Sequence, residues 1–325
     1  MAEMILREAL AKGLKEALDS DPNVFMMGED IGEYGGAYAV TQGFLEDYGP
    51  DRIKDTPISE AGFVGAGIGA ALGGLRPIVE LMTINFSLMA IDQIVNHAAR
   101  FRYMSNGQFS VPLLIRTVTG GGGQLGATHS QSFENWYASV PGLKVVVPAT
   151  PYDALGLLRS VVNDGNPIIF AEHALLYGSR GEVPEEWYEI PIGKASIKRS
   201  GDDITLVAYS RMTHVALEAA EILSERGIES EVVDLRSLRP WDEETVLNSV
   251  RKTNRVVVIE ETWKTGGFGA EIASTIQEKA FDDLDGPVAR VGGLDVPAPY
   301  ARNLESETIP SSKRILKVIA EHYGI

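Results

Sequence analysis

The sequence predicts an α/β protein with mostly parallel sheets, arranged as two consecutive domains. Short apolar runs alternate with segments of helical period, which is typical of helices layered on a parallel sheet. An acidic, proline-containing stretch at 181–200 interrupts the alternation, which then resumes. The length of 325 residues suits about two domains. We therefore expect domains at 1–180 and 201–325, joined by a linker at 181–200.

The expected elements follow from these alternating patterns. In the first domain, we expect strands at 24–27, 77–81, 111–116, 143–147 and 167–171, and helices at 4–20, 61–74, 86–104 and 151–164. In the second domain, we expect strands at 204–209, 231–235, 255–260 and 287–291, and helices at 212–226, 242–252, 269–281 and 311–323.

Composition and charge exclude several classes of function. Residues are 44% hydrophobic and 23% charged, as in ordinary globular proteins. A net charge of −16 makes nucleic acid and anionic membranes poor partners. The absence of cysteine excludes disulfides, thiolate metal sites and a cysteine nucleophile. Neither a signal or transit pattern nor an apolar run of membrane-spanning length is evident. We expect a cytoplasmic protein, or one of the plastid stroma if the gene is organellar.

Glu60 is the leading candidate for a functional carboxylate. It precedes the predicted helix 61–74, which consists of glycine, alanine and apolar residues and carries no charge. We expect this helix to be buried, with Glu60 at its head. Burying a carboxylate is unfavourable unless a partner binds it, and buried carboxyl groups with raised pKa values are typical of sites that handle protons.

The same helix contains a weak dinucleotide-binding pattern. Residues 65–70 approximate G-x-G-x-x-A. However, Gly62, Gly65, Gly69 and Gly73 recur every three or four residues and therefore share one helical face. No strand leads directly into the pattern, so we favour close packing of another helix on this face over a phosphate-binding turn.

A glycine-rich segment contains the second candidate, His129. Gly120–Gly123 follow a predicted strand, and His129 lies a few residues further on. Open α/β sheets bind ligands at the carboxyl ends of their strands. A mobile surface loop with an incidental histidine remains the alternative interpretation.

Several motifs stand in the order found in one known family. They are Thr56-Pro57-Ile58-Ser59-Glu60, Leu75-Arg76-Pro77-Ile78-Val79-Glu80, Ala90-Ile91-Asp92-Gln93-Ile94-Val95-Asn96, His129-Ser130-Gln131-Ser132, Tyr152-Asp153-Ala154 and Pro297-Ala298-Pro299-Tyr300. Over essentially its whole length, the chain resembles the beta subunits of the thiamine-diphosphate-dependent pyruvate dehydrogenase component of 2-oxo acid dehydrogenase complexes. The resemblance implies a transketolase-like pyrimidine-binding domain followed by a transketolase C-terminal domain.

The resemblance also implies roles for particular residues. Glu60 matches a glutamate that hydrogen-bonds the aminopyrimidine ring of thiamine diphosphate, and Met82 and Phe86 match positions beside that ring. His129 matches a histidine that assists proton transfer or reductive acetylation of lipoyl groups. Enzymes of this type hold the diphosphate through magnesium on a Gly-Asp-Gly segment, which this chain lacks. We therefore expect an alpha subunit that supplies magnesium, in an alpha-2-beta-2 heterotetramer.

Two further sites are implied by the family. A structural potassium site matches Leu113, Val161, Val162, Asp164 and Asn166, and the free carbonyls at a helix end near Asp164 suit a cation. Asp285 and the terminal Ile325 match positions that bind the dihydrolipoyl acetyltransferase core.

The expected substrate is pyruvate. Branched-chain 2-oxo acid and acetoin dehydrogenase beta subunits are the neighbouring alternatives, because part of the substrate pocket lies on the alpha chain. A non-catalytic assembly subunit and a nicotinamide-dependent dehydrogenase are more distant ones. An intact Glu60 and His129 argue against the assembly subunit.

Overall fold

The computed structural model describes residues 1–325, which form two compact units. The first unit comprises Met1–Thr119 and Trp136–Ile192, and the second comprises Gly120–Asn135 and Gly193–Ile325. The segment Gly120–Asn135 lies within the range of the first expected domain, yet it packs with the second unit. His129 therefore belongs to the second unit.

The first unit is built on parallel strands, as the α/β prediction requires. Six strands pair in parallel in the order β6-β7-β5-β4-β2-β3. All of them except the short strand β3 are largely buried and apolar, which reflects a sheet covered on both faces. The strands are β2 (Val24–Gly28), β3 (Ile53–Asp55), β4 (Arg76–Leu81), β5 (Leu114–Thr119), β6 (Lys144–Val146) and β7 (Ile168–His173).

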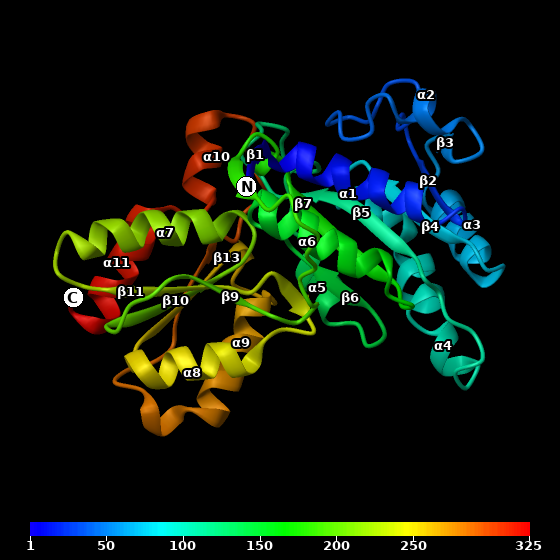
Figure 1. The fold of residues 1–325 in the computed structure, drawn as a ribbon. Helices are drawn as coiled ribbons and strands as arrows, with labels where there is room; N and C mark the ends of the chain where they lie inside the picture. Colours follow the sequence, from blue (N-terminus) through cyan, green and yellow to red (C-terminus); the bar gives the residue numbers. More distant parts are fainter. The chain divides into compact units, whose positions relative to one another are not determined.

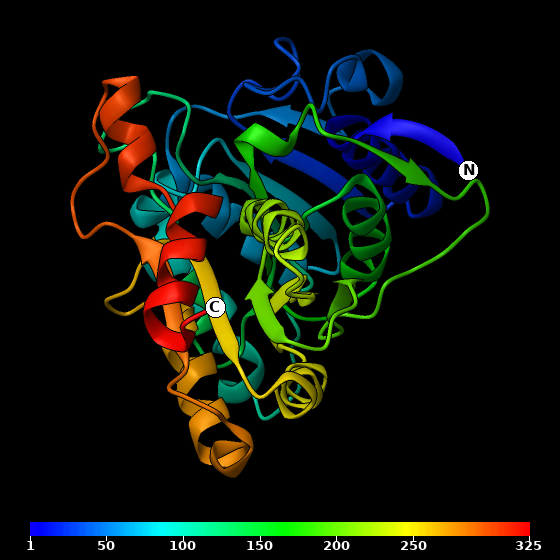
Figure 2. The same cartoon turned by 90° about the vertical axis from the view of Figure 1, so that its left-hand side faces the viewer.

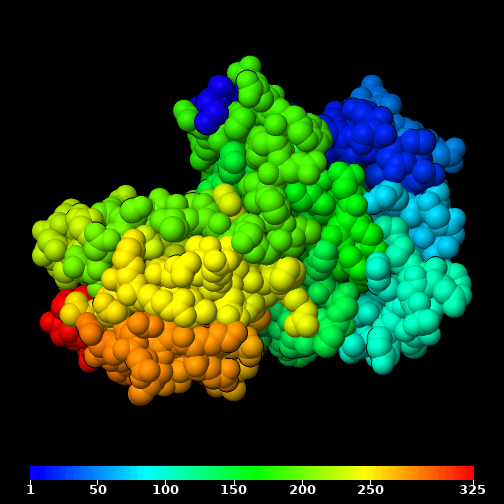
Figure 3. Space-filling view, turned by 60° about the horizontal axis from the view of Figure 1, so that its bottom comes forward, coloured from blue at the N-terminus to red at the C-terminus, as the bar shows by residue number.

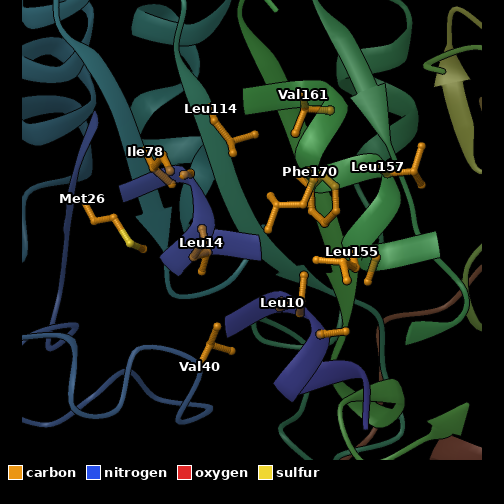
Figure 4. Packing of buried hydrophobic residues seen from close by; sticks show 14 of the residues in the cluster. Leu10, Leu14, Met26, Val40, Ile78, Leu114, Leu155, Leu157, Val161 and Phe170 are labelled. Carbon is orange, nitrogen blue, oxygen red and sulfur yellow. The ribbon is translucent and has the colours of Figure 1, made fainter. Parts of the chain in front are cut away.

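Two helices cover one face of this sheet. Helices α1 (Leu6–Ser20) and α6 (Pro151–Val162) lie side by side over the strands (Figure 1). They approach closely because Gly13 lacks a side chain; a Cβ there would lie 2.7 Å from Leu158 Cδ2. Between helices and sheet lies the main hydrophobic core (Figure 4), which includes Leu10, Leu14, Met26, Ile78, Leu114, Leu155 and Phe170.

Helix α3 (Glu60–Leu72) packs against β4 through a different glycine from those that the pattern emphasised. A Cβ on Gly67 would lie 2.8 Å from Val79 Cγ2, so this glycine contacts the sheet. Gly62 and Gly69 are exposed, and nothing lies within 4 Å of a Cβ placed on Gly69. The expectation that the whole helix is buried is therefore wrong. Of the four glycines that share one helical face, Gly62, Gly69 and Gly73 are exposed, and Gly65 is half-buried.

The segment expected as one helix at 86–104 is broken into three turns of different geometry. A 3-10 helix (Phe86–Ala90) leads into a π-helix (Gln93–Ala98) and then into α4 (Phe101–Met104). The π-helix lies against α3, where a Cβ on Gly65 would be 3.2 Å from the side-chain oxygen of Gln93. Such wide turns recur at functional sites. The remaining elements of this part of the chain are β1 (Ala2–Ile5), antiparallel to β8 (Arg180–Val183), together with α2 (Phe44–Tyr48), α5 (Glu134–Ala138) and a 3-10 turn (Ala174–Leu176).

The second unit has its own sheet, in the order β14-β13-β10-β11-β9, with β9 antiparallel to its neighbour. Helices α7 and α11 cover one face and α8 and α9 the other (Figures 1 and 2). No helix of the chain is both long and apolar enough to cross a membrane. The elements are β9 (Ser196–Arg199), β10 (Ile204–Ala208), α7 (Arg211–Ser224), β11 (Ser230–Asp234), β12 (Ser237–Arg239), α8 (Glu243–Thr253), β13 (Val256–Trp263), α9 (Phe268–Lys279), a 3-10 turn (Phe281–Asp283), β14 (Ala289–Gly293), α10 (Arg302–Thr308) and α11 (Ser312–Tyr323).

Candidate functional site

Three neighbouring strands of the first unit bring candidate residues to one edge of its sheet. Strands β4, β2 and β3 are adjacent and parallel, so their carboxyl ends meet. Glu29 directly follows β2, Met82 directly follows β4, and Glu60 begins the helix that comes after β3. Phe86 starts the 3-10 helix just beyond Met82. We call this place the carboxylate edge, defined by Glu29, Glu60, Met82 and Phe86.

Glu60 is buried at the first turn of α3, where the helix dipole favours a negative charge. Only 7% of the residue is exposed. The preceding Ser59 hydroxyl donates to the carbonyl of Pro57 and does not cap the helix. No hydrogen bond or ion pair joins the Glu60 carboxylate to another residue of the chain. Because a buried carboxylate without a partner is unfavourable, the side chain is suited to bind a donor on a ligand.

A second carboxyl group, Glu29, lies close enough to Glu60 to feel its charge. Glu29 is also 7% exposed, and its Oε1 atom is buried without a hydrogen-bond partner. Burial raises the pKa of Glu29, and the negative charges of Glu60 and Asp30 raise it further. Sequence reasoning missed this residue. The available signal was a glutamate directly after a buried strand.

Apolar side chains lie at the same edge as the two carboxyl groups. Met82 and Phe86 are half-buried, and Ile58, two residues before Glu60, is 85% exposed. The turn between Met82 and Phe86 is held by Asn85, whose Nδ2 donates to Thr83 Oγ1 at 2.6 Å. A flat apolar group with a polar rim matches this combination of side chains.

A buried ionic network fixes the strands that lead to this edge. Arg116 of β5 donates to both oxygens of Glu172 at 2.7 Å and to Glu80 Oε2 at 2.5 Å. The Tyr177 hydroxyl donates to Glu172 Oε2 at 2.7 Å. Although burial opposes the charge of Arg116, Glu172 and Glu80 raise its pKa. Glu80 lies two residues before Met82, so the network helps to fix where β4 ends.

His129 lies in the second unit, on the loop Gly120–Asn135. Its side chain is exposed, its backbone amide donates to the carbonyl of Gly126 at 3.2 Å, and its Nδ1 lies 2.9 Å from Thr128 Oγ1. Glu60, Met82 and Phe86 thus belong to one unit and His129 to the other.

The five residues of the expected potassium site line one small cavity of about 10 Å³ at the end of α6. Arg76 also lines it and donates to the carbonyls of Val162 and Asp164, at 2.9 and 3.4 Å. Desolvation alone would raise the pKa of Asp164, but hydrogen bonds from Lys144 and Asn166 lower it overall. No three or more His, Cys, Asp or Glu side chains of the chain gather in a group that could hold a metal ion.

Asp285 and the C-terminus lie near each other in the second unit. The C-terminal segment (red) meets the segment between α9 and β14 (orange) on the surface (Figure 3). Tyr323 donates to the carbonyl of Pro287 at 2.8 Å, which joins the two segments. Asp285 is exposed and its Oδ2 lies 3.5 Å from Arg255 Nε, while Ile325 packs against the core of the unit.

Comparison with known families matches both parts of the chain. Residues 2–179 match the transketolase pyrimidine-binding domain, and residues 193–315 match the transketolase C-terminal domain. Among solved structures, a split-gene transketolase, described as an inactive beta4 tetramer, aligns with a TM-score of 0.79 at 25% identity and covers 98% of this chain and 97% of its own. A Campylobacter jejuni transketolase aligns at 14% identity with a TM-score of 0.73, covering 98% of this chain and 47% of its own, which shows the fold alone. The α/β prediction is confirmed.

Curated relatives are similar over nearly the whole chain. The mitochondrial pyruvate dehydrogenase E1 component subunit beta-2 of Oryza sativa is 52% identical over 97% of this chain and 85% of its own length. The pyruvate dehydrogenase E1 component subunit beta of Rickettsia conorii is 46% identical over 99% of this chain and 100% of its own.

These relatives correct one expectation. A cytoplasmic location was inferred from composition and the absence of a targeting pattern, but that inference is wrong, because relatives from rice, Arabidopsis, pea and Dictyostelium are mitochondrial subunits. Other relatives of similar identity come from bacteria. Charge and composition do not distinguish these cases.

Proposed function

The chain belongs to the family of pyruvate dehydrogenase E1 component beta subunits, and we propose that it acts with an alpha subunit in thiamine-diphosphate-dependent oxidative decarboxylation of pyruvate and reductive acetylation of lipoyl groups. One observation carries the proposal. Glu60 is a buried carboxylate with no partner in the chain, at an edge that also presents Met82 and Phe86.

The residues at the carboxylate edge fit an aminopyrimidine ring. Glu60 would meet a ring nitrogen, and Met82 and Phe86 would pack against the flat ring. When bound, thiamine diphosphate supplies the nucleophilic carbon that adds to a 2-oxo acid and the electron sink that permits loss of carbon dioxide.

The residues of this chain would control protons around that chemistry. Glu60 would hydrogen-bond a nitrogen of the ring and so favour one tautomer of the ring. The neighbouring Glu29, whose pKa is raised first by burial and then by the negative charge of Glu60, would hold a proton more readily than an exposed glutamate. His129 would move a proton at its imidazole during acetyl transfer.

We propose that an alpha subunit completes the site and carries the diphosphate and magnesium, in an alpha-2-beta-2 heterotetramer. The outward face of α3, with exposed Gly62 and Gly69, offers a surface that another helix can approach closely. Ile58 and Met89 beside it are 85% and 69% exposed. The split-gene transketolase that aligns with this chain is an inactive assembly of beta chains, which supports the idea that such a chain needs a partner for activity.

We also propose a potassium ion at the end of α6 and a contact of Asp285 and Ile325 with the acetyltransferase core. The first rests on the small cavity at the end of α6, whose lining includes all five residues named by the family resemblance, Asp164 and Asn166 among them. The second rests on the proximity of two segments in a chain of net charge −16, which suits a basic partner segment. Replacing Asp285 by Asn should weaken binding of the core, and Asp295→Asn, at another exposed aspartate, is the matched control.

Reconstitution tests the proposed function. The chain alone, the alpha subunit alone and their mixture are assayed, with thiamine diphosphate and magnesium, for release of carbon dioxide from pyruvate and branched-chain 2-oxo acids and for consumption of acetoin. We expect activity only in the mixture and the highest kcat/KM with pyruvate. Activity of the chain alone would contradict the need for an alpha subunit. A higher kcat/KM with another substrate would contradict pyruvate as the substrate and favour the beta subunit of the corresponding dehydrogenase.

A further inference from the structure

The glycine-rich loop before His129 is held by two carboxylates from distant parts of the second unit. Glu305 of α10 accepts hydrogen bonds from the backbone amides of Gly122 and Gln124, at 3.0 and 2.9 Å. Glu261 of β13 accepts from the amide of Gly121 at 2.7 Å. Three amides within four residues therefore point at carboxylate oxygens.

The loop conformation suits this arrangement and depends on glycine. Gly120 and Gly122 have φ values of +90° and +94°, which L side chains rarely adopt. Successive amides in such a conformation form a concave site for an anion. Here the chain supplies the anion itself, since Glu305 is 2% exposed and is the buried residue of an otherwise exposed α10.

The other end of the loop is held by the segment that leads into α10. The ring of Tyr300 covers Gly126, where a Cβ would lie 2.4 Å from Tyr300 Cζ. Gly126 in turn accepts the hydrogen bond from the amide of His129. The segment 300–305 therefore contacts the glycine-rich loop at two places, the amides of Gly122 and Gln124 and the backbone of Gly126, and His129 lies a few residues after Gly126.

We propose that Glu305 is a positioning residue for His129, acting through the amides of Gly122 and Gln124. This inference rests on the function proposed above for His129. Hydrogen bonds to the amides of Gly122 and Gln124, together with the Tyr300 ring against Gly126, hold the backbone that leads to His129. Misplacing a catalytic group by about 1 Å costs on the order of a hundredfold in rate. Loss of the hydrogen bonds between Glu305 and the loop should therefore lower the rate measurably.

The test uses the reconstituted complex and compares Glu305→Gln, His129→Ala and the double variant. A glutamine presents an NH2 group to one of the two amides and loses that hydrogen bond. We expect Glu305→Gln to lower reductive acetylation of a lipoyl domain by about tenfold, with a smaller effect on its KM, because only placement of the imidazole changes. The double variant should be no slower than His129→Ala alone, since residues that act as a unit are not additive. Glu307→Gln, on the exposed face of the same helix, is the matched control.

Each outcome decides the inference. If Glu305→Gln has wild-type acetylation rates, or if its effect multiplies that of His129→Ala, Glu305 does not act through His129. If His129→Ala itself is fully active, the proposed role of His129 fails, and the inference fails with it. If Glu305→Gln does not assemble, Tyr300→Ala serves instead. It removes the contact of the Tyr300 ring with Gly126, and Tyr300 is 72% exposed. Tyr300→Ala should also slow acetylation, and an unchanged rate would contradict the proposal that the segment 300–305 positions His129.

Discussion

The negative charge of Glu60 acts on Glu29 across the carboxyl ends of two neighbouring parallel strands. Both residues are buried to the same extent, and neither Glu60 nor the Oε1 atom of Glu29 has a hydrogen-bond partner in the chain. Burial is the larger cause of the raised pKa of Glu29, and Glu60 is the next. Glu60 therefore acts electrostatically on a neighbouring carboxyl group that has no hydrogen-bond partner at Oε1.

Replacing Glu29 by Gln should make stability less dependent on pH. Because folding raises the pKa of Glu29 above 4.5, the folded chain binds this proton more tightly than the unfolded chain. The stability that the protonated group provides is lost as the pH rises through the raised pKa. Gln cannot lose a proton, so the free energy of unfolding of Glu29→Gln should decline less than that of the wild type between about pH 5 and pH 8. Glu33→Gln, at an exposed position, should follow the wild type. If the free energy of unfolding of Glu29→Gln and of the wild type depended on pH in the same way, the raised pKa of Glu29 would be contradicted.

Replacing Arg116 by Met should strongly destabilise the first unit. The substitution leaves Glu80 and Glu172 buried without their cation, which typically costs about 3–5 kcal/mol. Denaturant unfolding followed by circular dichroism measures the loss. Arg102→Met, at an exposed arginine, should change little. Equal stability of the two variants would show that the network does not support the fold.

Two glycines of α3 should respond oppositely to alanine. Gly69→Ala fills open space in a helix interior and should stabilise the isolated chain by about 0.5–1 kcal/mol. Gly67→Ala should destabilise it, because the new Cβ would lie 2.8 Å from Val79 Cγ2. Thermal unfolding of the isolated chain distinguishes the two.

The outward face of α3 makes a separate prediction about assembly. Gly69→Leu should leave the isolated chain folded but weaken association with the alpha subunit, since a large side chain prevents close approach. Analytical ultracentrifugation of the mixture measures this. Unchanged association of Gly69→Leu with the alpha subunit would show that the outward face of α3 is not part of the interface.

Potassium should stabilise the assembled protein beyond the effect of ionic strength. A ligand that binds only the folded state raises its stability, so the unfolding midpoint should be higher in potassium chloride than in an equal concentration of choline chloride. Asp164→Asn, which alters the lining of the cavity, should reduce that difference. Identical midpoints of the wild type in the two salts would argue against a bound ion.

Local patterns predicted the fold class and Glu60, but they could not predict long-range placement. Glu60 stands out because the helix that it begins has no other charge. Glu29 joins it only because β2 lies between β4 and β3, and strand order is not a local property. Family resemblance was needed to assign Met82 and Phe86 to the site, because apolar residues in such positions usually belong to the core.

The glycine loop illustrates the same limit. Its partners Glu261 and Glu305 are 140 and 183 residues away from the glycines that they bind. No spacing rule connects such positions, so it could not be predicted that His129 belongs to the second unit. The break in 86–104 was also unsignalled, because no glycine or proline interrupts the three turns.

The most direct measurement is decarboxylation of pyruvate by the reconstituted complex carrying Glu60→Gln, with an artificial electron acceptor replacing the lipoyl domain. Gln keeps the shape of the side chain but cannot exchange a proton. We expect normal assembly and a loss of activity on the order of a hundredfold or more, the scale of a lost acid–base group. Glu46→Gln, at an exposed position, should keep wild-type activity. Activity of Glu60→Gln equal to that of this control would contradict the role assigned to Glu60.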